Sequence, residues 1–443
     1  MDKDTIVDKQ YSIKTFGCKV NTYDSSLIQK TLMEKTWVER PLSDSAVKVH
    51  IVNTCAVTAE AVKEASRWVR HYRKKNPQSQ IVITGCAAQV ETEKFSDLEE
   101  VDLVVANSHK SELAEILSNS QRKKEKIFKS SIFKKNSLGA EGQLESAHTR
   151  LFLKIQDGCD SFCTFCIIPF ARGKSRSIPP ADLVRSVQKH YEEGVREVVL
   201  TGVHIGDYRI PGEEKKGLAE LIRILLQQTK MPRIRLSSLE PIELSNEILE
   251  LFTSPRVCPH FHLSVQSADS DVLRRMKRKY TEKDVENSLF RIHKICPLAF
   301  VGMDFIAGFA GESQKQFEDA YLRLKDWPWT KMHVFPYSPR RYTYAEKAYA
   351  AWPRSLVMKR ASLLRHLSEE RVKKERQKQV GSIKSVLPLR KKEQIGISRD
   401  YWTVNWSDAD FVKINRNGTS PEFRMYVRSV NEKNGYLKGD FVK

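Results

Sequence analysis

An alternation of short apolar runs and amphipathic segments, repeated six times after Leu151, restricts the fold of this chain more than any other feature. The apolar runs have the length of buried strands, and the segments between them, such as ADLVRSVQKHYEEG and LAELIRILLQQT, have helical periodicity. Six βα units predict an open, partial (βα)6 barrel with its functional site at the carboxyl ends of the strands. The six expected strands are LFLKIQ, REVVLTG, RIRLSS, HFHLSV, FVGMDFIAG and KMHVFP.

The first of these strands runs directly into a loop with three cysteines, Cys159, Cys163 and Cys166, in the spacing C-x3-C-x2-C. Structural zinc takes four protein ligands, and a self-contained iron–sulfur cluster also takes four. Three cysteines on a cubane cluster therefore leave one iron open to an exogenous ligand. The alternatives are a zinc knuckle with a remote fourth ligand and a set of reduced thiols. A zinc loop usually pairs two short C-x2-C elements, and the sequence has no second short cysteine pair.

A second group of three cysteines occurs at the ends of apolar runs in the N-terminal part of the chain. YSIKTFG leads to Cys18, VKVHIVNT leads to Cys55, and QIVITG leads to Cys86, with helical patterns between the runs. This strand-helix-strand order predicts a parallel α/β sheet, and the carboxyl ends of parallel strands lie at one edge. We therefore expect the three thiols to meet at that edge, although buried strand ends also favour cysteine for packing alone.

Composition limits the class of protein. The 443 residues, 40% hydrophobic, are enough for about two to four domains with proper cores. No signal peptide is evident, no apolar run approaches the ~18 residues of a membrane span, and eight cysteines are too sparse for a disulfide scaffold. We therefore expect a cytoplasmic protein. Its formal charge of +20 favours a polyanionic partner over a merely basic surface.

The remaining segments predict a linker, a long helix and a small barrel. The basic stretch from Ser118 to Asn136 is typical of a linker or an extended edge segment, and a charged helix is expected from Arg354 to Val380. After Gly381, about five short runs, including YWTVNW, DFVKINR, FRMYVRSV and YLKGDFVK, predict a β-barrel that binds nucleic acid. The expected domains are an N-terminal α/β domain at 9–120, a basic linker at 121–148, the barrel domain at 149–377 and the small β-barrel at 380–443.

Individual residues outside the two cysteine groups carry weaker predictions. Aromatic residues of the small barrel are candidates for stacking on RNA bases, with core packing as the more frequent role of any one of them. A basic run after the fourth strand is a candidate for phosphate contacts or is an exposed helix end. Cys258 and Cys296 have no partner motif and are interpreted as small buried residues. The aromatic candidates are Trp402, Trp406 and Tyr426, and the basic candidates are Arg274, Arg275, Lys277, Arg278 and Lys279.

Motifs along nearly the whole chain resemble the methylthiotransferase family of radical S-adenosylmethionine enzymes. Among them, NTCAVT, LTGVHIG and SSLEP resemble the MtaB branch of that family. Two stretches depart from the family pattern, namely GFAGES, with Ala310 in place of the usual proline, and a lengthened turn RIPGEEKKG. The motifs that carry the resemblance are TFGCKVN, NTCAVT, ITGC, QDGCDSFCTFCIIPFARG, LTGVHIGDY, LSSLEP, HFHLSVQSADSDVLRRMKRKY, GMDFIAGFAGES and HVFPYSPR.

The resemblance implies two [4Fe-4S] clusters and S-adenosylmethionine as cofactors. It implies that Cys159, Cys163 and Cys166 hold the cluster that binds S-adenosylmethionine, and that Cys18, Cys55 and Cys86 hold an auxiliary cluster. It further implies that the small barrel is an RNA-binding TRAM domain. The residues implied in contacts with S-adenosylmethionine are Phe165, Gly202, Glu240, Gln266, Ser267 and Gly308.

The implied activity is methylthiolation at C2 of N6-threonylcarbamoyladenosine, position 37 of tRNA, through a 5′-deoxyadenosyl radical. An electron donor such as flavodoxin or ferredoxin is expected, no membrane partner is expected, and the chain is expected to act as a monomer. Both cysteine groups must then face one anticodon loop, so the edge of the N-terminal sheet should lie over the mouth of the barrel. The alternatives are methylthiolation of isopentenyladenosine 37 or of a ribosomal-protein aspartate, a zinc-dependent RNA-binding protein without catalysis, and an electron-transfer protein.

Overall fold

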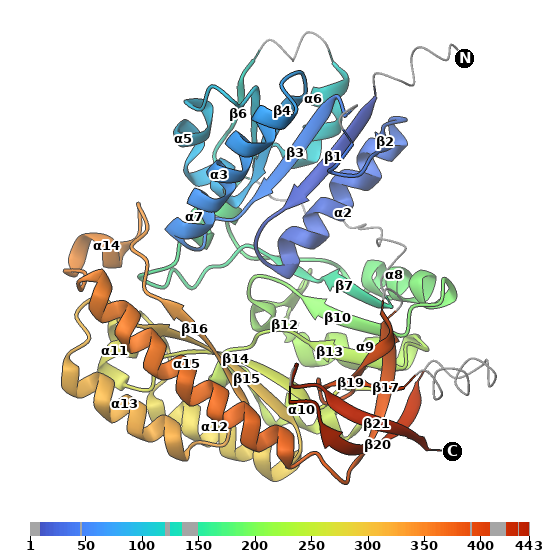
Figure 1. Cartoon of the computed structure of the whole chain (residues 1–443), viewed down its shortest axis with the longest axis vertical. Coiled ribbons are helices and arrows are strands. Elements are labelled where there is room, and N and C mark those ends of the chain that lie inside the picture. Colours follow the sequence, from blue (N-terminus) through green and yellow to red (C-terminus); the bar gives the residue numbers. More distant parts are fainter. Residues whose placement is uncertain are drawn as a thin grey trace.

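A computed structural model of the protein describes residues 9–44, 47–119, 125–134, 149–389, 392–407, 422–432 and 434–442. It has three parts, which we name the N-terminal sheet, the half-barrel and the C-terminal barrel (Figure 1). The N-terminal sheet lies above the half-barrel in the view of Figure 1, and the C-terminal barrel lies at the lower right. The predicted α/β fold class, with a partial (βα)6 barrel and a small β-barrel, is confirmed.

The N-terminal sheet has six parallel strands in the order β2-β1-β3-β4-β5-β6. The three strands predicted to end in cysteine are β1, β3 and β4, and they are adjacent. The other three strands were not predicted, because two to four residues are too few to show a strand pattern. The strands are β1 (Gln10–Thr15), β2 (Val38–Glu39), β3 (Val49–Thr54), β4 (Gln80–Gly85), β5 (Leu103–Ala106) and β6 (Ile127–Phe128); the helices are α2 (Lys19–Glu34), α3 (Ala59–Lys75), α4 (Cys86–Val90), α5 (Thr92–Ser96) and α6 (Leu113–Ser118).

Strand β6 lies inside the segment 121–148 that the sequence predicts to be a linker. It pairs in parallel with β5 and forms the edge of the N-terminal sheet, so at this point the chain is an extended edge segment and not a free connector. Backbone hydrogen bonds to β5 hold β6 in place. Such bonds do not depend on side chains, so the basic sequence of this segment does not reveal them. Most of the predicted linker, at 121–124 and 135–148, lies outside the described residues.

The half-barrel contains all six predicted strands in two parallel groups, β13-β10-β7 and β14-β15-β16. Isolated parallel bridges, Ile234 to Val257 and Leu239 to Leu263, connect the groups. Odd-numbered residues of β14 pack under the outer helices, so His262 and Ser264 face the interior. The strands are β7 (Arg150–Lys154), β10 (Glu197–Thr201), β13 (Arg233–Leu236), β14 (His260–Gln266), β15 (Phe300–Ala307) and β16 (Lys331–Pro336); the main helices are α8 (Pro180–Glu192), α9 (Leu218–Gln228), α10 (Asn246–Glu250), α12 (Glu282–Ile295), α13 (Gln314–Asp326) and α15 (Arg354–Gln377).

Short elements decorate the half-barrel. An antiparallel pair, β8 (Gln156–Asp157) with β9 (Arg176–Ser177), encloses the three-cysteine loop and the helix α7 (Ile168–Arg172). The lengthened turn after Tyr208 forms a two-stranded hairpin, β11 (Arg209–Ile210) and β12 (Glu213–Gly217). Two short helices, α11 (Ser270–Arg275) and α14 (Tyr344–Ala348), complete this part. None of the helices in the described ranges is both long and apolar enough to cross a bilayer.

The C-terminal barrel closes in the order β17-β18-β19-β21-β20. Trp402 and Trp406 lie in its core, so core packing is their role and the suggested stacking on RNA is wrong for these two, whereas Tyr426 is exposed. Burial of a large ring stabilises a small barrel that has few other core residues. The expected run DFVKINR lies outside the described residues. The strands are β17 (Ile383–Leu389), β18 (Lys392–Ser398), β19 (Thr403–Asn405), β20 (Phe423–Val430) and β21 (Leu437–Val442).

The C-terminal barrel lies against the amino ends of the half-barrel strands. Arg235 of β13 donates to both carboxylate oxygens of Glu197 at 2.9 Å and to the carbonyl of Arg399 at 2.9 Å. The rings of Phe300 and Trp402 meet edge to face with centres 5.1 Å apart. These contacts close the end of the half-barrel that is opposite to its predicted functional edge.

A buried network of charges joins the N-terminal sheet to the half-barrel. Asp24 of α2 accepts from Lys154 of β7 at 2.8 Å and from Arg172 of α7 at 2.9 Å. Asp157 of β8 accepts from the same two cations, at 3.2 Å and 2.9 Å. Lys110 is a third cation, 2.9 Å from Asp24. Burial alone would raise the pKa of Asp24, but Lys110, Lys154 and Arg172 together hold that pKa well below its usual value.

Asp24→Asn tests how much this network stabilises the docking of the two parts. Removing one partner of a buried ion cluster leaves uncompensated cations, and we expect a loss of about 3–5 kcal/mol in the free energy of unfolding of the N-terminal sheet. Urea denaturation would measure the change. Asp182→Asn is the matched control, because Asp182 pairs with Arg185 on an exposed helix and its loss should cost less than about 1 kcal/mol. Equal effects of the two variants would contradict the structural role of the network.

Candidate functional site

The three-cysteine loop begins at a backbone turn that only glycine fits. Gly158 has φ +79°, and a Cβ at this position would collide with the carbonyl of Lys174. The side chain of Gln156 braces the turn, because its Nε2 donates to the carbonyl of Gly158 at 2.7 Å and its Oε1 accepts from the backbone of His204 at 2.9 Å. The loop therefore has a fixed starting geometry directly after β8.

Each cysteine of this loop has a different electrostatic environment. Burial by itself raises the pKa of Cys159, but hydrogen bonds from His204 and Ser161 outweigh burial and leave that pKa below its usual value. A guanidinium N–H of Arg278 lies 3.5 Å from Cys163 Sγ. Burial, and then the charge of Cys163, raise the pKa of Cys166 to about 12. Burial also raises the pKa of Cys163, although the charge of Arg278 opposes that rise. Of the three, only Cys159 is shifted toward the thiolate, which is the form that binds iron.

Arg278 faces this site, so the prediction that it contacts phosphate is wrong. Its guanidinium is 2.5 Å from a carboxylate oxygen of Glu240 and lies over the ring of Phe165 at 5.8 Å. The basic run after β14 has exposed and buried members that the sequence does not distinguish: Arg274, Lys277 and Lys279 are exposed, whereas the side chain of Arg278 is buried. A phosphate role for the exposed members stays a prediction.

The residues predicted to contact S-adenosylmethionine lie near the carboxyl ends of the half-barrel strands. Gly202 follows β10, and a Cβ there would approach the carbonyl of Gln156 to 2.9 Å. Glu240 caps the turn after β13, in which the Glu243 carboxylate accepts from the Glu240 backbone at 2.7 Å. Gln266 ends β14 with φ +67°, and Ser267 beside it is buried.

The two remaining predicted contacts lie in an apolar cluster beside the loop. The ring of Phe165 meets that of Phe309 edge to face at 6.4 Å. Gly308 has φ +68°, and a Cβ there would press on Val357 of α15 at 3.1 Å. Packing is a sufficient reason for glycine at 308, so a ligand contact at this residue stays a prediction.

The thiols of Cys18, Cys55 and Cys86 come together at the carboxyl edge of β1, β3 and β4. Cys18 is the residue before α2, and Cys86 is the first residue of α4. Burial, and then the charges of Cys86 and Cys18, raise the pKa of Cys55 to about 12. Gly17 has φ +98°, and a Cβ at this position would be only 2.9 Å from Cys55 Sγ. Glycine therefore lets the backbone just before Cys18 lie close to the thiol of Cys55.

The two cysteine groups lie on either side of one interface. Helix α4, which starts at Cys86, shares an apolar core with Ile167 and Ala171, which follow Cys166. Arg172 donates to Asn21 at 2.6 Å, and Asn21 in turn lies 3.8 Å from Cys86 Sγ. Among the described residues, no three His, Cys, Asp or Glu side chains converge on a single metal ion.

Sequence reasoning missed a set of polar residues that face the interior of the half-barrel. His262 of β14 lies 3.4 Å from Asp304 of β15, and Ser238 Oγ lies 2.7 Å from His262 Nδ1. His333 of β16 is close, with its ring centre 5.4 Å from that of His262. A polar residue at every second position of an otherwise apolar strand was the available signal. Another residue that was missed, Lys19, reaches this interior from the N-terminal sheet, and its Nζ is 5.8 Å from the ring centre of Phe152.

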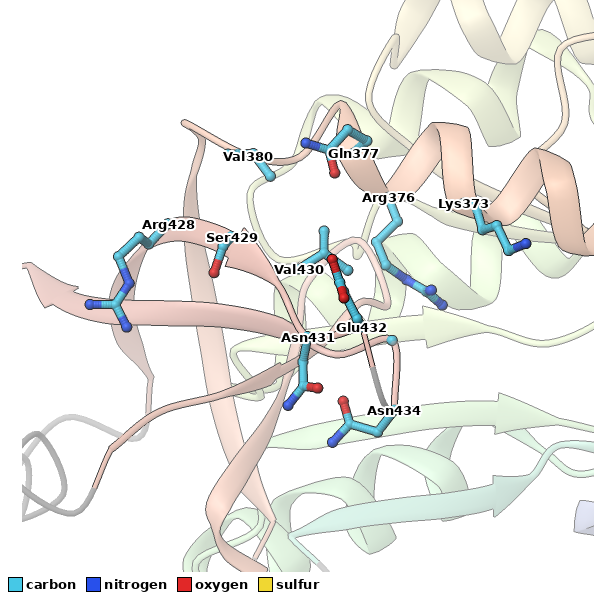
Figure 2. Close-up of a pocket in the computed structure, with 11 residues that line it drawn as sticks. Lys373, Arg376, Gln377, Val380, Arg428, Ser429, Val430, Asn431, Glu432 and Asn434 are labelled. Atoms are coloured by element: carbon cyan, nitrogen blue, oxygen red, sulfur yellow. The ribbon is translucent and has the colours of Figure 1, made fainter.

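A separate basic pocket of about 700 Å³ lies between the end of α15 and the C-terminal barrel. Figure 2 shows Lys373 and Arg376 on the helix and Arg428 on β20 around this pocket, with the side-chain amides of Asn431 and Asn434 below. Cations and amides on one concave surface are the groups that bind RNA phosphates and base edges.

Two family profiles match this chain. The profile described as Uncharacterized protein family UPF0004 matches residues 10–106, and the profile described as Radical SAM superfamily matches residues 153–324. The threonylcarbamoyladenosine tRNA methylthiotransferase MtaB of Aquifex aeolicus is 36% identical over 364 residues, which cover 81% of this chain and 88% of that protein. MtaB of Bacillus subtilis is 31% identical over 437 residues, 97% of this chain and 95% of that protein. The chain belongs to the MtaB family of methylthiotransferases.

Similarity to the MtaB family exceeds similarity to another methylthiolating enzyme. The tRNA-2-methylthio-N(6)-dimethylallyladenosine synthase of Syntrophus aciditrophicus is 27% identical over 390 residues, 86% of this chain and 83% of that protein. Among solved structures, the radical S-adenosylmethionine methyltransferase TsrM of Kitasatospora setae has a TM-score of 0.53 at 14% identity, covering 75% of this chain and 77% of that one. At that identity the likeness concerns the fold. The radical SAM match itself implies S-adenosylmethionine and a [4Fe-4S] cluster.

Gly158→Ala tests whether the geometry of the turn is needed for iron binding in this MtaB-family protein. We expect the collision with Lys174 to displace Cys159 and to lower the iron bound per chain after anaerobic reconstitution. Gly212→Ala is the control, because Gly212 also has positive φ, +84°, but faces open space. Its iron content should match that of the wild type, and a Gly158→Ala protein with full iron content would show that the turn does not position the cysteines.

Proposed function

We propose that the protein transfers a methylthio group to C2 of N6-threonylcarbamoyladenosine at position 37 of tRNA, with S-adenosylmethionine and two [4Fe-4S] clusters as cofactors. The observation that carries the proposal is the meeting of two incomplete thiol groups across the contact of α4 with α7. C2 of adenine is an unactivated aromatic carbon, so an ordinary acid or base does not remove its hydrogen, and a radical is required.

The residues present fit two such clusters. Each group offers three thiols, which matches a cubane with one open iron. Cys159, Cys163 and Cys166 would hold one cluster, and Cys18, Cys55 and Cys86 would hold the other. When bound, the first cluster supplies the reductive cleavage of S-adenosylmethionine and the second supplies a carrier for sulfur. Burial raises the pKa of Cys55 and Cys166, so both are protonated near neutral pH. Binding of iron must therefore displace their protons.

The chain's own residues set the charge and orientation at both groups. His204 hydrogen-bonds to Cys159, and Glu243 accepts from the other ring nitrogen of His204 at 2.6 Å, so the imidazole has a fixed orientation. Arg278 brings a positive charge to Cys163. At the auxiliary group, three cations surround the two carboxylates of the buried network, so one positive charge remains to offset thiolates. Glu240, Gln266 and Ser267 are proposed to contact S-adenosylmethionine.

Binding of tRNA is proposed to use the surplus of positive charge. The anticodon loop would enter between the N-terminal sheet and the half-barrel, where both thiol groups lie, and another part of the tRNA would contact the basic pocket of Figure 2. We further propose a flavodoxin or ferredoxin as electron donor and a monomer in the cytoplasm, where thiols stay reduced.

Cys18→Ala separates the two proposed clusters. Wild-type protein reconstituted without oxygen should bind about eight irons and form the methylthio product on tRNA that carries N6-threonylcarbamoyladenosine. The variant should bind about four irons, still cleave S-adenosylmethionine to 5′-deoxyadenosine, and form no methylthio product. Cys296→Ser is the control and should behave as wild type, because Cys296 lies apart from both groups at the end of α12.

Two outcomes would contradict the proposal. A colourless reconstituted protein that contains zinc and no iron would favour the RNA-binding alternative. Mass analysis of tRNA nucleosides from cells that lack the protein tests the acceptor, and intact methylthiolated threonylcarbamoyladenosine in such cells would exclude it. Loss of the methylthiolated isopentenyl nucleoside instead would favour the other adenosine 37 substrate.

Lys373→Ala combined with Arg428→Ala tests the basic pocket. We expect weaker tRNA binding. The slope of log K for tRNA binding against log salt concentration should become less steep by the equivalent of about one to two phosphate contacts, because each contact releases counterions. The measurement is a titration of tRNA at several salt concentrations. Lys315→Ala with Lys325→Ala on α13 removes the same charge elsewhere and is the control. If both pairs of substitutions change the salt slope equally, the pocket has no special role.

A further inference from the structure

Lys19 directly follows Cys18, and its side chain extends from the N-terminal sheet into the half-barrel. Its Nζ lies 5.8 Å from the ring centre of Phe152, which faces the interior from β7. Burial is the main influence on the pKa values of His262, Asp304 and His333, and the charge of Lys19 acts on all three. These residues lie on β14, β15 and β16, so the ammonium of Lys19 is within electrostatic reach of three further strands.

The interior around Lys19 offers hydrogen-bonding groups beside it. His262 is held between Ser238, at 2.7 Å from its Nδ1, and Asp304, at 3.4 Å from its Nε2. Gly302 leaves one edge of the His262 ring uncovered, because a Cβ there would be 3.0 Å from Cδ2 of that ring. Phe152 provides an apolar surface under the ammonium. Together these polar groups face the interior of the half-barrel within electrostatic reach of Lys19, which follows Cys18 in the chain.

Lys19 differs from the other cations at this interface. Lys110 and Lys154 each pair with Asp24, and Arg172 pairs with Asp24 and Asp157. Among the described residues, no carboxylate pairs with Lys19, whose ammonium instead lies over the ring of Phe152. Arg172 and Asn21 already lie beside the auxiliary thiols. A partly buried ammonium without a counter-charge favours an anionic ligand.

We propose that Lys19 and the hydroxyl of Ser238, which His262 orients, bind the carboxylate of the threonylcarbamoyl group and thereby select the substrate. This inference rests on the proposed function. A threonylcarbamoyl group carries a free carboxylate and a hydroxyl, whereas an isopentenyl group carries neither. A site built for a polar group rejects an apolar analogue strongly, because its own buried polar groups would then lose their water without gaining a partner.

Asp304 is compatible with an anionic ligand in this place. Burial raises the pKa of Asp304 to about 7, so its carboxyl group is partly protonated near neutral pH. In that form it repels a bound carboxylate less, and it can donate a hydrogen bond to the carbamoyl oxygen.

The test removes the charge from the protein and from the ligand in turn. Reconstituted wild type and Lys19→Gln protein are titrated with three anticodon stem-loops, which carry at position 37 the threonylcarbamoyl group, its methyl ester, or an unmodified adenosine. We expect wild type to bind the acid roughly 10- to 100-fold more tightly than the ester. Lys19→Gln should bind acid and ester alike. Lys19→Arg should restore most of the preference, and Lys14→Gln, on the same sheet edge, should leave it unchanged.

The outcomes separate this inference from the proposed function. Wild-type protein that forms methylthio product on the acid but binds acid and ester equally overturns the role of Lys19, whatever the variant does. Lys19→Gln that weakens all three stem-loops equally shows a phosphate contact and also overturns it. Wild-type protein that forms no product on the acid contradicts the proposed function. Iron counts verify that Lys19→Gln retains the auxiliary group, and the ester comparison in wild type stays decisive if it does not.

Discussion

The buried charge network around Asp24 is the interaction on which the geometry of the site depends. Asp24 belongs to the helix that starts after Cys18, whereas Lys154, Asp157 and Arg172 belong to the two strands and the helix that flank the three-cysteine loop. Ion pairs removed from water are directional and costly to break. The network therefore fixes the edge of the N-terminal sheet against the carboxyl ends of the half-barrel strands, where the two thiol groups meet.

Different interactions close the two ends of the half-barrel. At the carboxyl end, α4 packs on α7 and Lys19 extends inward, so polar groups and thiols dominate. At the amino end, Arg233 and Arg235 with Glu197 hold the C-terminal barrel, and Phe300 packs on Trp402. One end therefore concentrates the groups that can do chemistry, and the other joins a barrel and a basic pocket suited to RNA.

Much of the fold could be predicted because its signals are local. All six half-barrel strands and the three strands that end in cysteine followed from periodicity, whereas β2, β5 and β6 were too short to show it. The environment of single residues was harder to predict. Trp402 and Trp406 lie in the core of the C-terminal barrel, and a strand pattern alone does not say which face of a small barrel is inside. Arg278 is another example, because it lies in a basic run but turns toward Cys163 and Glu240.

The sequence alone determined the elements, the spacing of Cys159, Cys163 and Cys166, and the gathering of Cys18, Cys55 and Cys86 at one sheet edge, because strand order and carboxyl ends follow from local pattern. Tertiary structure decided that the two groups share an interface, that Lys19 enters the half-barrel, and that His262 and Asp304 face it. These facts depend on ion pairs and packing between residues more than 100 positions apart, such as Asp24 with Lys154 and Lys19 with Phe152, and no local pattern encodes them.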